Sequence, residues 1–167
     1  MFAALGCIAK LLTVDLIPLL LPLILQRMKH TDRDVRFASC SALITIFNLD
    51  PSSLVDSSDT IQSVFSLIGD KDISIMHAVV CLLNKMYSTC QKNLSEELVE
   101  DIPNVASIIA RLLHNTACGK LTATDTSMIY HGVPAPWLQI ECLKLLKLLS
   151  YWDSSFGVVF IIQQFSL

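Results

Sequence analysis

Two stretches of this sequence, 38 positions apart, combine an aspartate at a short turn with the start of an apolar helical pattern. They are Asp34-Val35-Arg36-Phe37-Ala38 and Asp72-Ile73-Ser74-Ile75-Met76. A period near 40 residues with two helices per unit is typical of HEAT and armadillo arrays. One helical hairpin cannot bury its own apolar face, so successive hairpins stack and share a core. We therefore predict an all-α fold, a HEAT/armadillo-like α-α solenoid present as a partial array.

Helical patterns account for almost the whole chain. No Asn-Gly or Asp-Gly hairpin turn occurs, and no long run alternates apolar and polar residues, so strand signals are nearly absent. Pro18 and Pro22 lack an amide proton, and we expect the helix around them to start late or to kink. Pro136 suits a first helical position. The expected helices cover about residues 1–12, 13–30, 34–47, 58–68, 72–87, 95–114 and 136–149.

These helices group into repeats of unequal regularity. Residues 1–12 are interpreted as the end of a preceding repeat, and residues 14–48, 56–92 and 95–149 as three repeats, the last with a turn-rich insertion. Residues 150–167 form an atypical hydrophobic tail, which would aggregate unless it is covered. We expect marginal solubility, and a chain that is a fragment, a splice product or a truncated gene model.

Composition excludes several classes of protein. The chain is 53% hydrophobic and 16% charged, with a net charge of -3 and a pI of about 5.7, so no global basic field attracts nucleic acid. Six scattered cysteines lack the spacing of a secreted disulfide framework and favour a reducing cytosolic setting. The longest apolar run, residues 16–25, is too short for a membrane span. We expect a soluble protein without a nucleic-acid partner.

Motifs for phosphate or calcium binding are incomplete. Gly119-Lys120 is followed by Leu121, where a phosphate loop needs Ser or Thr. Residues 70–74 space Asp, Asp and Ser as a calcium loop does, but Ile75 stands at the glycine position. A turn that opens a helix accounts for these aspartates better.

Metal ligands and nucleophiles also lack companions. His77 with Cys81 and His114 with Cys118 would each place two ligands on one helical face, but zinc needs four ligands, or three and a water. No Gly-x-Ser-x-Gly nucleophile motif occurs. We predict no metal, no cofactor and no enzymatic activity.

The insertion between His114 and Pro136 is the one feature that the repeat does not require. Loops of this length are usually functional or disordered, and its aromatic and apolar end argues against simple disorder. Tyr130 and Trp137 either pin the loop onto the helices or contact a partner. The candidate contact residues are Tyr130, His131 and Trp137, with Lys144 and Lys147 as weaker candidates whose alternative is a solvated helix face.

The same region resembles a known family. Val133-Pro134-Ala135-Pro136-Trp137-Leu138, followed by the leucine-rich residues 143–149, is similar to the large adaptin subunits of vesicle-coat adaptor complexes. Gly119-Lys120-Leu121 together with Tyr130-His131 makes the chain look most like the epsilon type, the large chain of the fourth adaptor complex. The resemblance spans about residues 3 to 149, so residues 1–149 are expected to be adaptin-trunk-like.

This resemblance implies a scaffold in a heterotetrameric adaptor that sorts cargo into vesicles at the trans-Golgi network and endosomes. The implied partners are a beta-type large adaptin, a medium (mu) and a small (sigma) subunit, and an Arf-family small GTPase. The protein would lie in the cytoplasm, peripheral on the cytosolic face of those membranes and on coated vesicles. The alternative is a HEAT-repeat regulatory scaffold or transport receptor unrelated to coats.

Overall fold

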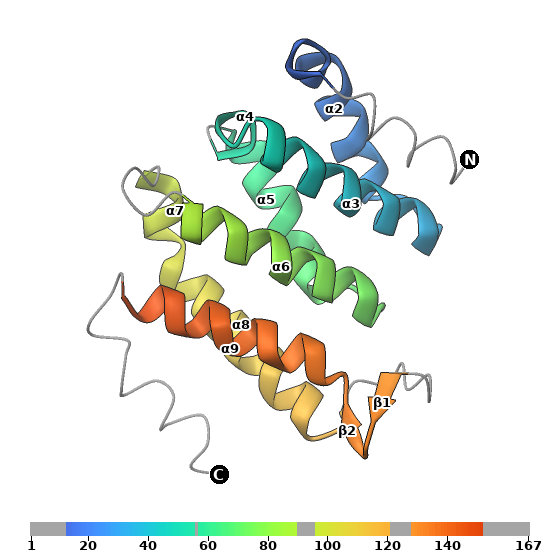
Figure 1. Cartoon of the computed structure of the whole chain (residues 1–167), viewed down its shortest axis with the longest axis vertical. Helices are drawn as coiled ribbons and strands as arrows, with labels where there is room; N and C mark the ends of the chain where they lie inside the picture. The colour runs from blue at the N-terminus through green and yellow to red at the C-terminus, as the bar shows by residue number, and fades with distance from the viewer. Residues whose placement is uncertain (1–12, 56, 90–95, 121–127, 152–167) are drawn as a thin grey trace. The chain divides into compact units, whose positions relative to one another are not determined.

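The computed structural model describes residues 13–55, 57–89, 96–120 and 128–151, whose helices and strands are labelled in Figure 1. The chain divides into two compact units, Met1–Leu82 and Leu83–Leu167, and the division falls inside helix α6 (Ile73–Thr89). The helix expected over residues 1–12 and nearly all of the expected tail lie outside the described residues. Among the described residues, no helix combines the length and the apolar character needed to cross a membrane.

The first unit begins with a 3-10 turn, η1 (Val14–Leu16), that leads into α2 (Ile17–Met28). Pro18 lies in the first turn of α2, where its missing amide proton leaves no hydrogen bond unmade. The predicted late start is therefore confirmed. Pro22 lies inside the helix. Helix α2 packs against the next helix, and its buried residues are Ile17, Ile24 and Met28.

Helix α3 (Arg33–Leu49) begins one residue before the predicted Asp34. Its N-cap is Asp32, whose Oδ1 accepts a hydrogen bond from the amide of Asp34 at 2.8 Å. The assignment of Asp34 as the opening residue was wrong, because Asp32 has the extended backbone that a cap requires. The predicted end of the helix at Asp50 and Pro51 is confirmed by the C-cap at Asp50.

Three short elements follow: α4 (Ser52–Val55), α5 (Ser58–Ser66) and η2 (Leu67–Gly69). The predicted opening of α6 by Asp72 is confirmed, since its Oδ1 accepts from the amides of Ser74 at 2.9 Å and Ile75 at 3.2 Å. Helices α3 and α6 thus begin at Arg33 and Ile73, 40 positions apart rather than the predicted 38.

The second unit holds two helices where one was predicted between residues 95 and 114. Helix α7 (Glu96–Glu100) ends before Asp101, and α8 (Ile102–Ala117) begins after it. Pro103 in the first turn of α8 cannot donate the amide hydrogen bond that a continuous helix needs. Tyr87, at the end of α6, donates its hydroxyl to the carbonyl of Leu98 in α7 at 3.3 Å.

A two-stranded hairpin, β1 (Ile129–Tyr130) with β2 (Val133–Pro134), precedes the last helix and was not predicted. Both turn residues have positive φ, 49° at His131 and 80° at Gly132, which is the pattern of a type I′ hairpin turn. Histidine is enriched in left-handed backbone, so His131-Gly132 forms the turn that the sequence analysis had expected only of Asn-Gly or Asp-Gly.

Helix α9 (Pro136–Ser150) begins at Pro136, as predicted, and packs along α8 (Figure 1). Ala135 precedes it with a φ of 41°, and its amide donates to the carbonyl of Met128 at 2.7 Å. The predicted apolar stripe is confirmed, because all four of its members are at most 1% exposed: Leu138, Cys142, Leu145 and Leu149. Helix α9 contacts α8, whose buried residues include Val105, Ile109 and Leu112.

Candidate functional site on helix α9

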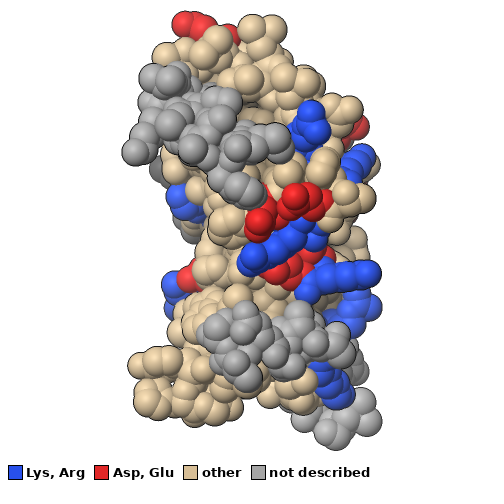
Figure 2. Space-filling view, turned by 90° about the vertical axis from the view of Figure 1, so that its right-hand side faces the viewer, with Lys and Arg blue, Asp and Glu red and all other residues tan. Residues whose placement is uncertain are grey.

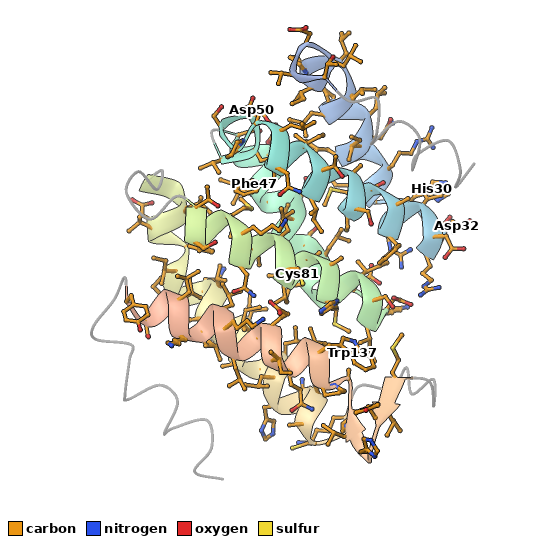
Figure 3. All side chains as sticks on the ribbon, viewed as in Figure 1. His30, Asp32, Phe47, Asp50, Cys81 and Trp137 are labelled. Atoms are coloured by element: carbon orange, nitrogen blue, oxygen red, sulfur yellow. The ribbon has the colours of Figure 1, made fainter. Side chains whose placement is uncertain are left out.

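Helix α9 has an outer face opposite the stripe that it buries. The residues of this face recur at spacings of three and four, so they lie within a narrow arc of the helix. We define the outer face by these residues: Trp137, Ile140, Lys144, Lys147 and Tyr151. Trp137 is half-buried at the start of α9 (Figure 3), Ile140 is 52% exposed and Tyr151 is 75% exposed. The face therefore combines aromatic, aliphatic and basic groups in one row.

Three of the five predicted contact residues are brought together on this face: Trp137, Lys144 and Lys147. The other two, Tyr130 and His131, lie at the turn of the hairpin that leads into α9. Their rings meet edge to face, with centroids 4.3 Å apart and planes at 79°. Tyr130 is 62% exposed, so its ring does not pin the loop onto the helices.

The base of the hairpin is tied to α9 by a hydrogen bond rather than by Tyr130. The side-chain amide of Gln139 donates to the carbonyl of Pro134 at 2.7 Å. Because Pro134 is the last residue of β2, this bond fixes the end of the hairpin against the first turn of α9. Ile129 and Val133 remain 42% and 43% exposed, which adds apolar surface next to the start of the outer face.

A chain of polar contacts positions Lys144. Its ammonium lies 2.7 Å from Oε1 of Glu141, whose other carboxylate oxygen accepts from the amide of Asn84 on α6 at 2.9 Å. The Asn84 amide also donates to the backbone carbonyl of Glu141 at 3.0 Å. Lys144 is 61% exposed, so this ion pair orients the side chain more than it stabilises the fold.

Two residues of the outer face, Ile140 and Tyr151, were missed by the sequence reasoning. Their signal was available, because Ile140 on α9 and Tyr151 at its C-cap each lie three or four positions from a predicted contact residue.

The pairs considered for metal binding form local contacts instead. Cys81 Sγ lies 3.6 Å from His77 Nε2, and Cys118 Sγ lies 3.7 Å from His114 Nε2. In the described ranges, no group of three or more His, Cys, Asp or Glu could hold a metal ion. Burial raises the pKa of the Cys40 thiol to about 12, which keeps that cysteine protonated and unreactive at neutral pH.

The aspartates of the rejected calcium motif have structural partners. Arg36 forms a bidentate pair with Asp70, with Nε to Oδ2 at 2.7 Å and Nη2 to Oδ1 at 3.0 Å. Arg33 pairs with Asp72 at 2.7 Å. Figure 2 shows basic and acidic side chains gathered on the face where α3 and α6 begin. These charges join the start of α3 to the turn before α6.

The Arg36–Asp70 pair is largely buried, and the interaction shifts the pKa of both side chains. Burial opposes ionisation of Asp70, but hydrogen bonds from Arg36 and from the amide of Asp72 outweigh it and lower the pKa of the carboxyl. The same hydrogen bond raises the pKa of the Arg36 guanidinium. Arg36 Nη1 also donates to the carbonyls of His30 and Thr31, so the guanidinium is held on several sides.

A groove of about 640 Å³ in the first unit was not predicted. Residues of α2 with its C-cap and of α5 line it: Pro22, Leu25, Gln26, Lys29, Asp59, Gln62, Ser63 and Ser66. Its two charged residues, Lys29 and Asp59, are both exposed and have opposite signs. No set of catalytic groups converges there among the residues that line it.

Comparison with known proteins identifies the relatives of the chain. Residues 1–163 match the family described as the adaptin N-terminal region. The AP-4 complex subunit epsilon of Dictyostelium discoideum is 28% identical over 179 residues, which cover 90% of this chain and 16% of that protein. The Arabidopsis thaliana protein of the same name is 28% identical over 153 residues, covering 92% and 15%.

The mouse protein, AP-4 complex subunit epsilon-1, is 28% identical over 154 residues, covering 90% of this chain and 12% of that protein. The chain thus spans less than a fifth of the length of these relatives. No solved structure matches it. The predicted all-α solenoid class and the predicted similarity to epsilon chains are both confirmed. By its match over residues 1–163, the chain belongs to the adaptin N-terminal region family.

Proposed function

We propose that this chain is a scaffold segment of the large subunit of a heterotetrameric adaptor complex in vesicle-mediated intracellular protein transport. The observation that carries the proposal is the family match over residues 1–163. The similar proteins of three organisms are all named as epsilon subunits of the AP-4 complex. A subunit of such a complex has a structural role, so we propose no enzymatic activity.

The proposed partners are a beta-type large adaptin, a medium subunit and a small subunit, with an Arf-family GTPase that recruits the assembly. The proposed place of action is the cytosolic face of trans-Golgi network and endosomal membranes, where the complex sorts cargo. These assignments rest on the resemblance to large adaptins and on the names of the relatives. The same match favours an adaptor subunit over a regulatory scaffold unrelated to coats.

We further propose that the outer face of α9 and the hairpin turn contact one of these subunits. Tyrosine and tryptophan are enriched in the centres of protein interfaces, because they contribute a large contact area with few rotatable bonds. Trp137, Tyr151 and Tyr130 supply such groups, and Ile140 adds apolar area between them. Lys144 and Lys147 fit the polar rim, where charge guides association more than it adds affinity.

Affinity isolation of the tagged protein that contains this chain, followed by mass spectrometry, tests the proposed function. We expect a beta-type, a medium and a small adaptor subunit to be recovered together in near-equal amounts. Recovery of none of the three, from cells that make the tagged protein in soluble form, would overturn the proposal. Imaging of the same protein beside a trans-Golgi marker tests the proposed location.

A further inference from the structure

The groove between α2 and α5 combines apolar atoms with polar side chains from both helices. Its volume of about 640 Å³ lies in the range of roughly 300 to 1,000 Å³ that is typical of ligand sites. Pro22 and the half-buried Leu25 supply apolar atoms from α2. Gln26 and Gln62 are exposed and supply one amide from each helix. The groove can therefore bind a ligand that offers apolar contacts together with hydrogen-bond donors and acceptors.

The two helices that line the groove end at the same end of the first unit. The Arg36 guanidinium donates to the carbonyl of His30, just after α2, at 3.0 Å, and it pairs with Asp70, just after η2, at 2.7 Å. Helices α2 and α5 accordingly run in the same direction (Figure 1). Lys29 is the C-cap of α2, whereas Asp59 lies in the first turn of α5. The positive and the negative charge therefore lie toward opposite ends of the groove.

The length of the groove matches a short piece of extended chain. Its lining runs from Pro22 to Lys29 on α2. On α5 it runs from Asp59 to Ser66. Each span covers a rise of about 10 Å along a helix axis. An extended chain advances about 3.3 Å per residue, so a segment of about three to four residues fits this length.

The polar groups of the groove are available to a ligand. Within the described part of the chain, four of its side chains form no hydrogen bond or ion pair: Gln26, Lys29, Asp59 and Gln62. A glutamine amide both donates and accepts, which complements the N–H and C=O of a peptide unit. Pro22 also has no amide proton to donate to the carbonyl of Pro18, so this acceptor lacks its regular helical partner. Such groups suit recognition of a polypeptide backbone.

We propose that the groove between α2 and α5 binds an extended peptide segment of a partner protein, which places a basic side chain at Asp59 and an acidic side chain at Lys29. The two charged residues of the peptide are about three positions apart. Gln26 and Gln62 hydrogen-bond to its backbone, and Leu25 contacts its apolar atoms. Opposite charges at the two ends favour a segment that carries both signs over one that is uniformly acidic or basic. The inference uses no residue of the outer face of α9 and does not rest on the proposed function.

Selection from a phage-displayed library of random linear peptides on the full chain tests the proposal. We expect the enriched peptides to carry one basic and one acidic residue about three positions apart. A fluorescein-labelled synthetic peptide of the most enriched sequence then serves as the probe in fluorescence polarisation. Absence of enrichment, or enrichment of uniformly acidic, uniformly basic or purely apolar sequences, would overturn the proposal.

Charge reversal shows whether the probe occupies the groove. Lys29→Glu should weaken binding of the probe roughly tenfold, and a probe whose acidic residue is replaced by lysine should regain affinity for this variant. Arg27→Glu is the matched control, because Arg27 is an exposed cation on α2 that lies outside the lining of the groove. Equal losses in Lys29→Glu and Arg27→Glu would overturn the proposal.

The backbone contacts are tested with a double variant and a modified probe. Gln26→Ala combined with Gln62→Ala should weaken binding roughly tenfold while helical content by circular dichroism stays the same, because both side chains are exposed. A probe with N-methylated central residues should show a similar loss on the unmodified chain. Full affinity of the N-methylated probe would overturn the proposal. Probe binding that is lost as the chain self-associates would assign the groove to a second copy and overturn it as well.

Discussion

Helices α3 and α9 bury the same stripe of positions when they are aligned by their first residues, Arg33 and Pro136, but the residues opposite that stripe differ. The stripe consists of Val35, Ser39, Ala42 and Ile46 in α3 and of Leu138, Cys142, Leu145 and Leu149 in α9. In α3 the aligned outer positions are Asp34, Phe37, Ser41, Ile44 and Asn48, whereas α9 carries Trp137, Ile140, Lys144, Lys147 and Tyr151. The arginines of the first unit, Arg33 and Arg36, are engaged by aspartates of the turn before α6. The largely buried Arg36–Asp70 pair joins the start of α3 to the turn before α6, whereas Lys144 and Lys147 of α9 stand at an exposed surface.

The largest expected effect comes from breaking the stripe that α3 and α9 share. Leu145→Ala removes a fully buried side chain and leaves a cavity between α8 and α9, so we expect it to lower the free energy of unfolding by about 2 to 5 kcal/mol. Ile140→Ala, on the outer face of the same helix, should change it by less than about 0.5 kcal/mol. Urea titrations followed by circular dichroism measure both. Equal losses would mean that the two faces of α9 are not distinct.

The next largest effect on the free energy of unfolding is expected from removing the buried Arg36–Asp70 ion pair, compared with removing an exposed pair. Asp70→Ala leaves the Arg36 guanidinium without its bidentate partner, which should lower the free energy of unfolding by about 3 kcal/mol. Asp34→Ala removes a pair in which both side chains are about half-exposed, and it should have an effect of less than about 1 kcal/mol. The same urea titration compares them. A small effect of Asp70→Ala would show that the charges near α3 are dispensable for folding.

A smaller effect is expected at the hairpin turn before α9. Gly132 has a φ of 80°, where any other residue is strained, although the space around it is open. Gly132→Ala should therefore cost about 1 kcal/mol through backbone strain alone. Gly69→Ala is the control, because Gly69 has no positive φ and equally open space. If the two variants melt alike, the turn does not impose the left-handed backbone in solution.

The smallest expected effect is the acid sensitivity of the Arg36–Asp70 pair. The pKa of Asp70 is lowered in the folded chain, so its contribution to stability is fully present above its ordinary value near 3.8. That contribution is lost as the pH falls below 3.8 through the folded pKa. Unfolding titrations between neutral pH and acid should show a shallower loss for Asp70→Asn than for the unmodified chain. Parallel pH profiles would contradict the assignment of the shift to this carboxyl.

Much of the fold follows from local sequence signals, and the departures have local causes. Apolar periodicity predicted the buried stripe of α9, and Pro136 predicted its start, because both depend on spacing within one helix. The cap of α3 was misplaced by two residues, since Asp32 and Asp34 carry the same side chain and only the backbone at Asp32 is extended. The break at Asp101 was missed, although Pro103 was a sufficient signal.

The candidate site was harder to predict than the fold. The exposure of Tyr130 depends on the hairpin, which was hidden because His131-Gly132 is a less common turn sequence than Asn-Gly. The position of Lys144 depends on a contact between Glu141 and Asn84, which are far apart in sequence. Apolar periodicity predicts which residues lie outside the core, but it does not predict which exposed face binds a partner.

Quantitative recovery of adaptor subunits tests most directly the claim that α9 is open for a partner while α3 serves the fold. The tagged protein is isolated from cells in three forms: unmodified, with Ile140→Asp and Lys147→Glu on α9, and with the aligned Phe37→Asp and Ile44→Glu on α3. We predict that the α9 variant keeps its helical content but loses at least one of the beta-type, medium and small subunits by roughly tenfold. The α3 variant should retain all three subunits wherever it folds. Undiminished recovery of all three with the α9 variant would contradict the account.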